Sequence, residues 1–205
     1  MNEHSAYLTD GQPDRGRILF AHGAGAPMDS DFMQAAALGL ADAGFQVMRF
    51  EFPYMQARRA DGRRRPPNRM PQLLDYFRAR IDELDDGVPL WLAGKSMGGR
   101  AATLLLAEVP AYVRGALVFG YPFYAVKKPQ QPRIEHLAQL DLPVHIFQGT
   151  RDALGSQAQV ESFALSPQVR LHWMEDGDHD LKPRKVSGFT QQMHLATAFG
   201  IVARL

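Results

Sequence analysis

One segment near the middle of the chain, residues 90–100, constrains the fold more than any other. It reads LWLAGKSMGGR, an apolar run that ends on small residues and continues into an alanine- and leucine-rich stretch. This pattern predicts a strand, a sharp turn and a helix. Gly94, Ser96 and Gly98 match G-x-S-x-G, the nucleophile elbow, in which a strained turn exposes a serine hydroxyl above a parallel sheet. The pattern is short, so other parts of the chain must supply a base, an acid and an oxyanion hole.

The same residues also resemble the end of a phosphate-binding Walker loop, because lysine and serine follow a glycine. A Walker motif needs another glycine five residues before Gly94, and that position is Pro89. We therefore do not assign a nucleotide-phosphate site here.

Length and composition indicate one globular α/β domain over residues 1–205, with 45% hydrophobic and 22% charged residues. No apolar run approaches the roughly 20 residues that span a bilayer. Residues 1–14 lack the apolar centre of a secretory signal, so we expect a cytoplasmic protein without a membrane partner. The chain has no cysteine, which excludes a thiol nucleophile and a cysteine metal site.

Charge is unevenly distributed along the chain, although the formal net charge is only +1. Residues 58–69 contain six arginines and one aspartate, a local charge of +5, which leaves 17 basic against 21 acidic residues elsewhere. A nucleic-acid-binding domain would spread positive charge over a whole face, so we expect no nucleic-acid partner.

Predicted strands alternate with predicted helices throughout. Besides the strand before Ser96, strands are expected at 17–21, 45–52, 115–120, 143–149 and 169–174. Helices are expected from 29 or 30 to 43, and at 71–84, 101–109, 157–164 and 186–203, with a turn or two at 134–139, while 54–71 and 121–131 are expected to be loops. The alternation predicts a doubly wound, mostly parallel sheet with right-handed crossovers covering both faces.

Residues that follow parallel strands meet at one edge of the sheet, whatever their separation in sequence. Ser96, Asp152 and His179 each follow a predicted strand, and this chain order is the one associated with α/β-hydrolases. His179 would take the serine proton, and Asp152 would fix the imidazole tautomer and stabilise its charged form. Asp141 precedes its strand and so lies at the opposite edge, while Asp178 and Asp180 remain weaker alternatives beside His179. The other candidate bases are expected to be packing or surface residues: His145, His172 and His194.

Negative charge that develops on a substrate oxygen needs backbone donors. The N–H of Met97, at the start of the elbow helix, and the N–H of Ala24, in the glycine turn that follows residues 17–21, are the candidates for this oxyanion hole. His22 precedes that turn and is expected to support the loop or, alternatively, to contact substrate.

Four short sequences together resemble a small serine hydrolase of the α/β-hydrolase superfamily, of the dienelactone-hydrolase-like size class: HGAG at 22–25, GKSMGG at 94–99, GTRD at 149–152 and GDH at 177–179. Residues 93–100, with Phe52-Pro53-Tyr54 and the arginine segment, resemble a little-characterised bacterial branch of that superfamily. The resemblance implies an α/β-hydrolase fold, a Ser-His-Asp triad and hydrolysis of an ester-like bond. It does not indicate which substrate is hydrolysed. We see no segment long enough for a full helical lid, and Lys95 departs from the residue types usual at its position.

Positive charge is also expected at the edge of the sheet that carries Ser96. Lys95, Arg58 and Arg59 are candidate substrate-binding residues there, and further cations follow neighbouring strands: Lys127, Lys128, Lys182, Arg184 and Lys185. An anionic small-molecule ester is one hypothesis, and solvated loops are the other. For Lys95 the alternatives are a cation beside the nucleophile and a side chain that turns away to pair with a carboxylate.

The sequence therefore predicts a serine hydrolase that works through an acyl-enzyme, with no metal and no organic cofactor. The alternative is a non-catalytic α/β-hydrolase-fold module that binds a partner through its arginine segment. The acyl group, the leaving group and the oligomeric state are not predicted.

Overall fold

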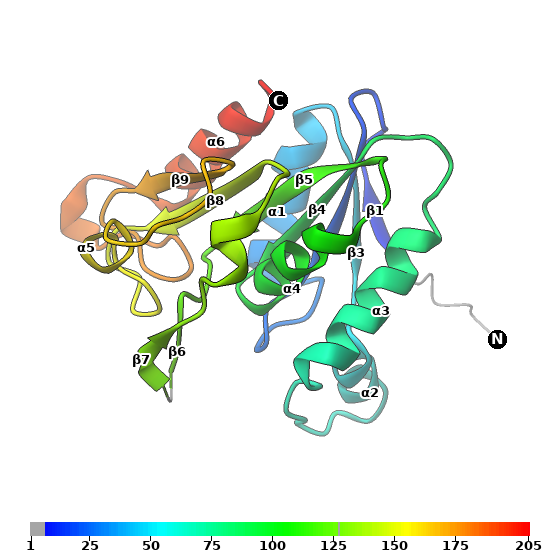
Figure 1. Cartoon of the computed structure of the whole chain (residues 1–205), viewed down its shortest axis with the longest axis horizontal. Coiled ribbons are helices and arrows are strands. Elements are labelled where there is room, and N and C mark those ends of the chain that lie inside the picture. The colour runs from blue at the N-terminus through cyan, green and yellow to red at the C-terminus, as the bar shows by residue number, and fades with distance from the viewer. Residues whose placement is uncertain (1–6, 127) are drawn as a thin grey trace.

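The structure is a computed structural model that describes residues 7–126 and 128–205, built around a seven-stranded sheet (Figure 1). The strand order is β1-β3-β2-β4-β5-β8-β9, and all neighbours are parallel except β1, which pairs antiparallel with β3. The strands are β1 (Leu8–Asp10), β2 (Arg17–Ala21), β3 (Gln46–Phe50), β4 (Leu90–Lys95), β5 (Val113–Phe119), β8 (Val144–Gly149) and β9 (Val169–Met174). The predicted mostly parallel α/β sheet is confirmed.

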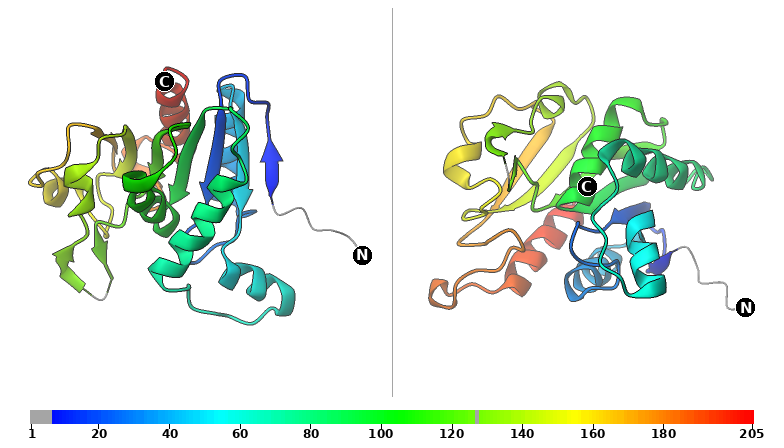
Figure 2. Two further views of the ribbon diagram at one scale, coloured as in Figure 1. Left: turned by 45° about the vertical axis from the view of Figure 1, so that its right-hand side comes forward. Right: turned by 90° about the horizontal axis from the view of Figure 1, so that it is seen from below.

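Helices cover both faces of the sheet, as Figure 2 shows. The helices are α1 (Asp31–Asp42), α2 (Pro53–Asp61), α3 (Met70–Asp82), α4 (Met97–Leu105), α5 (Gln157–Val160) and α6 (Gln191–Val202). Helices α1 and α6 pack against one face, and α3 and α4 pack against the other. Successive residues of β2 enter opposite cores, since Leu19 lies with α3 and α4 while Ile18 and Phe20 lie with α1. This explains the unbroken apolar run, because a strand covered on both faces needs no polar alternation.

Helix α2 corrects the prediction that residues 54–71 form one loop. Pro53 occupies the first helical turn, where its missing N–H costs nothing, and Gly62 ends the helix with a left-handed φ of 70°. Tyr54 and Met55 bury their side chains in the core that contains α3 and α4. The arginine- and proline-rich composition of residues 58–69 conceals these two apolar anchors of the helix.

Other differences concern short or terminal elements. Strand β1 was not predicted, and the expected loop at 121–131 contains a small antiparallel hairpin, β6 (Tyr124–Ala125) and β7 (Lys128–Pro132). The closing helix begins only at Gln191, where Thr190 caps it by accepting the Met193 N–H, and α5 ends at Val160. Short 3-10 turns lie at Leu106–Glu108, His136–Gln139 and Lys185–Ser187.

The topology fixes where a site can form. The chain leaves β2 for β3 on one side and later enters β4 on the other, so the strand order reverses between β2 and β4. A crevice opens at such a point beyond the carboxyl ends of the strands. Within residues 7–126 and 128–205, no helix has the length and apolar composition to cross a membrane.

Candidate active site

Ser96 sits on a strained turn between β4 and α4. Its φ of 52° and ψ of −112° lie where residues other than glycine are rarely found. A Cβ at Gly94 would lie 2.1 Å from the carbonyl carbon of Gly98, and one at Gly98 would lie 2.5 Å from the carbonyl oxygen of Ala21. The close approach of these backbones therefore requires both glycines of the motif.

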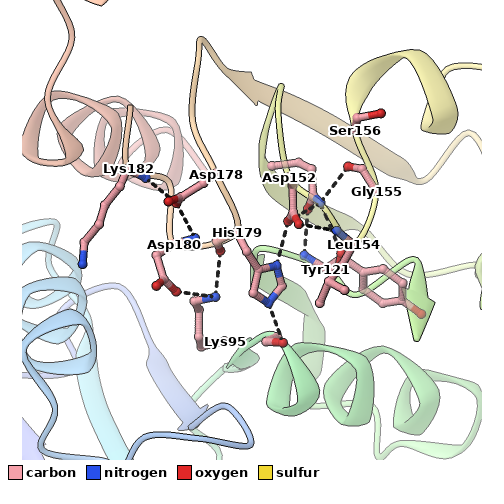
Figure 3. A network of polar contacts seen from close by, with 12 residues as sticks. Lys95, Tyr121, Asp152, Leu154, Gly155, Ser156, Asp178, His179, Asp180 and Lys182 are labelled. Carbon is pink, nitrogen blue, oxygen red and sulfur yellow. Dashed lines mark hydrogen bonds and ion pairs between the residues drawn. The ribbon is translucent and has the colours of Figure 1, made fainter. Parts of the chain in front are cut away.

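His179 lies between Ser96 and Asp152, on the segment that follows β9 (Figure 3). Its Nε2 is 2.8 Å from the Ser96 Oγ, and its Nδ1 is 2.7 Å from the Asp152 Oδ2. A carboxylate only accepts, so the Nδ1 proton points to Asp152 and Nε2 is left to accept the serine proton. This arrangement can activate a serine hydroxyl.

Asp152 is completely buried and fully hydrogen-bonded. Its Oδ1 accepts the backbone N–H of Leu154 at 2.7 Å, and its Oδ2 also accepts the side-chain amide of Gln148 at 2.8 Å. These donors compensate for burying a carboxylate. The Gln148 Oε1 in turn accepts the backbone N–H of Tyr121 at 2.7 Å. Gln148 was not singled out from the sequence, although an amide near the end of a mostly apolar strand is a signal that could have found it.

Met97 and Ala24, the expected oxyanion-hole residues, line the same hollow as Ser96. Met97 is the first residue of α4, where a backbone N–H has no partner within the helix. Ala24 lies in the loop after β2, and its carbonyl oxygen accepts the Tyr54 hydroxyl at 3.0 Å. The loop is thus held by α2, the helix that the sequence did not reveal.

His22 lies beneath the surface, supports the loop after β2 and does not line the Ser96 cleft. Its side chain is completely buried. Its Nε2 accepts the Phe52 N–H at 3.1 Å, so its Nδ1 carries the proton and donates to the Gly23 carbonyl at 2.6 Å. Burial lowers the pKa of His22, which keeps the ring neutral. The structure gives no support to substrate contact by His22. Its hydrogen bonds fit the alternative, in which His22 supports the loop after β2.

Lys95 is also buried, and it turns toward the His179 segment. Its Nζ donates to the His179 carbonyl oxygen at 2.8 Å and lies 3.2 Å from the Asp180 Oδ1 (Figure 3). It also lies 5.5 Å from the centre of the Phe32 ring, a cation–π distance. Burial lowers the pKa of Lys95, and the charge of Asp180 opposes that shift. These contacts fit the alternative in which Lys95 pairs with a carboxylate. Lys95 nevertheless lines the cleft and is not turned away from it.

Arg58 and Arg59 lie away from Ser96. They line a separate hollow of about 170 Å³ with Pro27, Met55 and Gly62. The Arg59 guanidinium is held by Asp29 at 2.8 Å and by Glu51 at 2.6 Å. The structure therefore gives no support to substrate binding by this pair, because one cation is already neutralised and neither lines the cleft.

The other expected cations differ in their surroundings. Lys182 lines the Ser96 cleft, Arg184 pairs with Asp176, and Lys185 belongs to a 3-10 turn. Lys127 lies outside the described residues, and Lys128 begins β7.

The three histidines that were expected to be packing or surface residues make contacts elsewhere in the fold. His145 Nδ1 lies 3.0 Å from His172 Nε2, and His194 Nδ1 donates to the Leu181 carbonyl oxygen at 2.8 Å. No group of three or more His, Cys, Asp or Glu side chains in the described part of the chain could hold a metal ion.

Ser96 opens onto a cleft of about 650 Å³. His179, Lys95 and Asp180 line one side of it, and the α1 residues Asp31 and Phe32 line another. Tyr124 and Ala125 of the β6–β7 hairpin line a second hollow together with Ser96.

A sheet of this topology with a serine at such a turn defines the α/β-hydrolase class. A family model described as an alpha/beta hydrolase domain matches residues 14–205, and the chain belongs to that family. The narrower resemblance to dienelactone hydrolases stays a prediction.

Solved structures share the fold at low sequence identity. An esterase domain of a Rhodothermus marinus protein is 15% identical with a TM-score of 0.66, over 97% of this chain and 90% of that one. An α/β serine hydrolase homologue from Coxiella burnetii is 16% identical with a TM-score of 0.68, over 97% and 89%. A thioesterase domain from the curacin biosynthetic pathway is 16% identical with a TM-score of 0.64, over 97% and 93%. At these identities the likeness concerns the fold alone. Together with the family membership it supports the assignment of the chain as a hydrolase.

Proposed function

We propose that this protein is a serine hydrolase that cleaves an ester-like bond, a carboxylic ester or a thioester, through an acyl-enzyme. The observation that carries the proposal is the position of His179, whose ring nitrogens lie 2.8 Å from Ser96 Oγ and 2.7 Å from Asp152 Oδ2. A serine needs a base within this distance to be a nucleophile near neutral pH.

In the proposed reaction, Ser96 Oγ attacks the acyl carbon while His179 Nε2 takes its proton. The backbone N–H groups of Met97 and Ala24 stabilise the oxyanion, and His179 returns the proton to the leaving group. Water then attacks the acyl-enzyme by the same route and releases the acid and free Ser96. Asp152 holds the imidazole and stabilises its charged form.

The competing function, partner binding through the arginine segment, has less support. Arg59 is held by Asp29 and Glu51, and Arg65 is held by Asp61 at 2.5 Å, so two of these guanidinium groups are engaged within the chain. The fold likeness to an esterase domain and to a thioesterase domain is compatible with the proposed bond types.

Hydrolysis of a panel of neutral acyl esters and thioesters tests the proposal, with Ser96→Ala as the blank. We expect release of the leaving group by the wild type well above the blank for at least one acyl length. Equal rates for the wild type and Ser96→Ala on every substrate would refute a serine hydrolase.

A further inference from the structure

A second hollow, of about 250 Å³, shares Ser96 and Ala24 with the His179 cleft and extends in another direction. Its lining includes Ser96, Met97 and Ala24 together with Arg100 and Arg133. Both arginines also line an adjoining hollow of about 870 Å³. Ser96 therefore lines one of two hollows that share Arg100 and Arg133, which together are called the arginine groove below.

The backbone fixes the positions of both arginines. Arg100 lies one turn after Ser96 on α4, about 6 Å farther along the helix axis, and its N–H donates to the Ser96 carbonyl oxygen at 2.9 Å. Arg133 follows β7, its N–H donates to the Phe123 carbonyl oxygen at 2.8 Å, and its own carbonyl accepts the Tyr121 hydroxyl at 2.8 Å. The two cations thus come from a rigid helix and from an anchored strand end.

Neither arginine forms an ion pair with any carboxylate of residues 7–126 and 128–205, in contrast to Arg59, Arg65 and Arg184. The Nε of Arg100 is buried and has no hydrogen-bond partner among these residues. Burial, and then the charge of Arg100, lower the pKa of Arg133, so the Arg133 cation is partly desolvated and is repelled by Arg100. Glu135 lines only the outer hollow, without pairing to either arginine. An anion between Arg100 and Arg133 would relieve this repulsion.

The position of His179 indicates which part of the substrate enters this groove. His179 must deliver a proton to the leaving group, and it lines the 650 Å³ cleft but not the arginine groove. The leaving group therefore belongs in the His179 cleft, and the acyl chain extends past Met97 toward the arginines.

We propose that Arg100 and Arg133 form a subsite for a carboxylate at the far end of the acyl group, so that the preferred substrates are half-esters or half-thioesters of short dicarboxylic acids. The inference rests on the proposed function. In acylation, the bond from Ser96 Oγ to the acyl carbon forms as the bond to the leaving oxygen or sulfur breaks and that atom takes the His179 proton. Water then releases the dicarboxylate and restores Ser96.

The test compares two 4-nitrophenyl esters of adipic acid, one with its second carboxyl group free and one with that group capped as the methyl ester. For the wild type, with the Ser96→Ala rate subtracted, we expect kcat/KM to be at least about tenfold higher for the free acid. Arg100→Gln and Arg133→Gln should each reduce this ratio about tenfold or more. Arg114→Gln is the matched control, because Arg114 is exposed near the start of β5, at the opposite end from Ser96, and its loss should leave the ratio unchanged.

A second measurement uses only the wild-type protein, so it tests the subsite even if an arginine variant does not fold. Adipamate, with one carboxylate and one amide, should inhibit hydrolysis of the capped ester competitively, and the neutral diamide should inhibit at least about tenfold less well. A second pair of esters carries the carboxylate, free or methylated, on the phenol and has a butanoyl acyl group. These two should react at similar rates if the acyl side holds the anion.

Three results would overturn the subsite. They are a wild-type ratio near one, a ratio unchanged in both folded arginine variants, and a preference for the carboxylate on the phenol. In each of these cases Ser96-dependent hydrolysis of the capped ester still supports the proposed function. Failure of that function is distinct, because no ester would then be hydrolysed above the Ser96→Ala blank.

Discussion

The side-chain ammonium of Lys95 donates a hydrogen bond to the backbone carbonyl oxygen of His179 at 2.8 Å, and Asp180 lies 3.2 Å from the same ammonium. Lys95 directly precedes Ser96, so the turn that carries the serine is tied to the segment that carries the histidine. A buried, charge-assisted hydrogen bond is a strong constraint of this kind. We infer that Lys95 is a positioning residue that sets the distance between nucleophile and base.

Replacing Lys95 by Met should therefore lower kcat by about tenfold or more with little change in KM, because small displacements of reacting groups are costly while the substrate contacts remain. Steady-state kinetics well below the unfolding temperature measure both constants. Asp180→Asn is the matched control, since it removes the ion pair but keeps the bond to the carbonyl, and its effect should be smaller. If Lys95→Met leaves activity and stability unchanged, Lys95 acts neither as a positioning residue nor as a cation in the site.

Replacing Asp152 by Asn should lower kcat by about three to four orders of magnitude, because an amide would no longer hold the imidazole in the tautomer that accepts the serine proton. Circular dichroism should show an intact fold. The control is Asp141→Asn, which changes an exposed carboxylate ahead of β8 and should leave kcat at the wild-type value. Comparable losses in both variants would contradict the role given to Asp152.

Replacing Gly98 by Ala should destabilise the fold by more than about 3 kcal/mol, because the new Cβ would lie 2.5 Å from the Ala21 carbonyl oxygen and neither backbone can move freely. Gly200→Ala gives the opposite case within α6, where the nearest atom is the flexible Arg204 Nη1 at 3.9 Å. There the free energy of unfolding should rise by up to about 1 kcal/mol. Urea unfolding of the two variants measures both effects, and equal shifts would argue against the packing described for the turn.

The stability of the protein should fall as the pH is lowered from about 6.5 to about 4. Burial, followed by the charges of His172 and Arg170, lowers the pKa of His145 from 6.5 to about 4. Between these values the unfolded state binds the proton and the folded state does not, so acid favours unfolding. One such group contributes at most about 1.4 kcal/mol per pH unit.

The free energy of unfolding of the wild type and of His145→Gln, measured in urea at several pH values from 4 to 7, checks this prediction. The variant should show a shallower decline, with the remaining slope owed to other groups such as His136, whose pKa burial also lowers to about 4. Identical slopes in the two proteins would show that His145 does not contribute.

The central sheet could be predicted from the sequence because strands buried on both faces appear as short apolar runs that end at or near a glycine. Residues 17–21, 90–95 and 144–149 are of this kind. The G-x-S-x-G motif nominated Ser96, and knowing that parallel strand ends converge then nominated Asp152 and His179, which the structure brings within hydrogen-bond distance. The nominations of the acid and the base depend on topology more than on local sequence.

What could not be predicted depends on contacts between distant segments. Helix α2 is stabilised by burying Tyr54 and Met55, and the arginine- and proline-rich composition of residues 54–71 made the segment look like a loop. The arginines beside Ser96 are not in that segment, because Arg133 reaches the groove only through the β6–β7 hairpin. The amide of Gln148 near the end of its strand is a visible signal, but that it donates to Asp152 depends on how the chain folds after the strand.

Labelling by a fluorophosphonate probe, read by intact mass and peptide mapping, tests most directly whether Ser96 is an activated nucleophile. The wild type should gain one probe on Ser96, because His179 lies 2.8 Å from its hydroxyl. Ser96→Ala should not be labelled, and His179→Ala should be labelled far more slowly. No labelling of the folded wild type, or equal labelling of Ser96→Ala, would contradict the account.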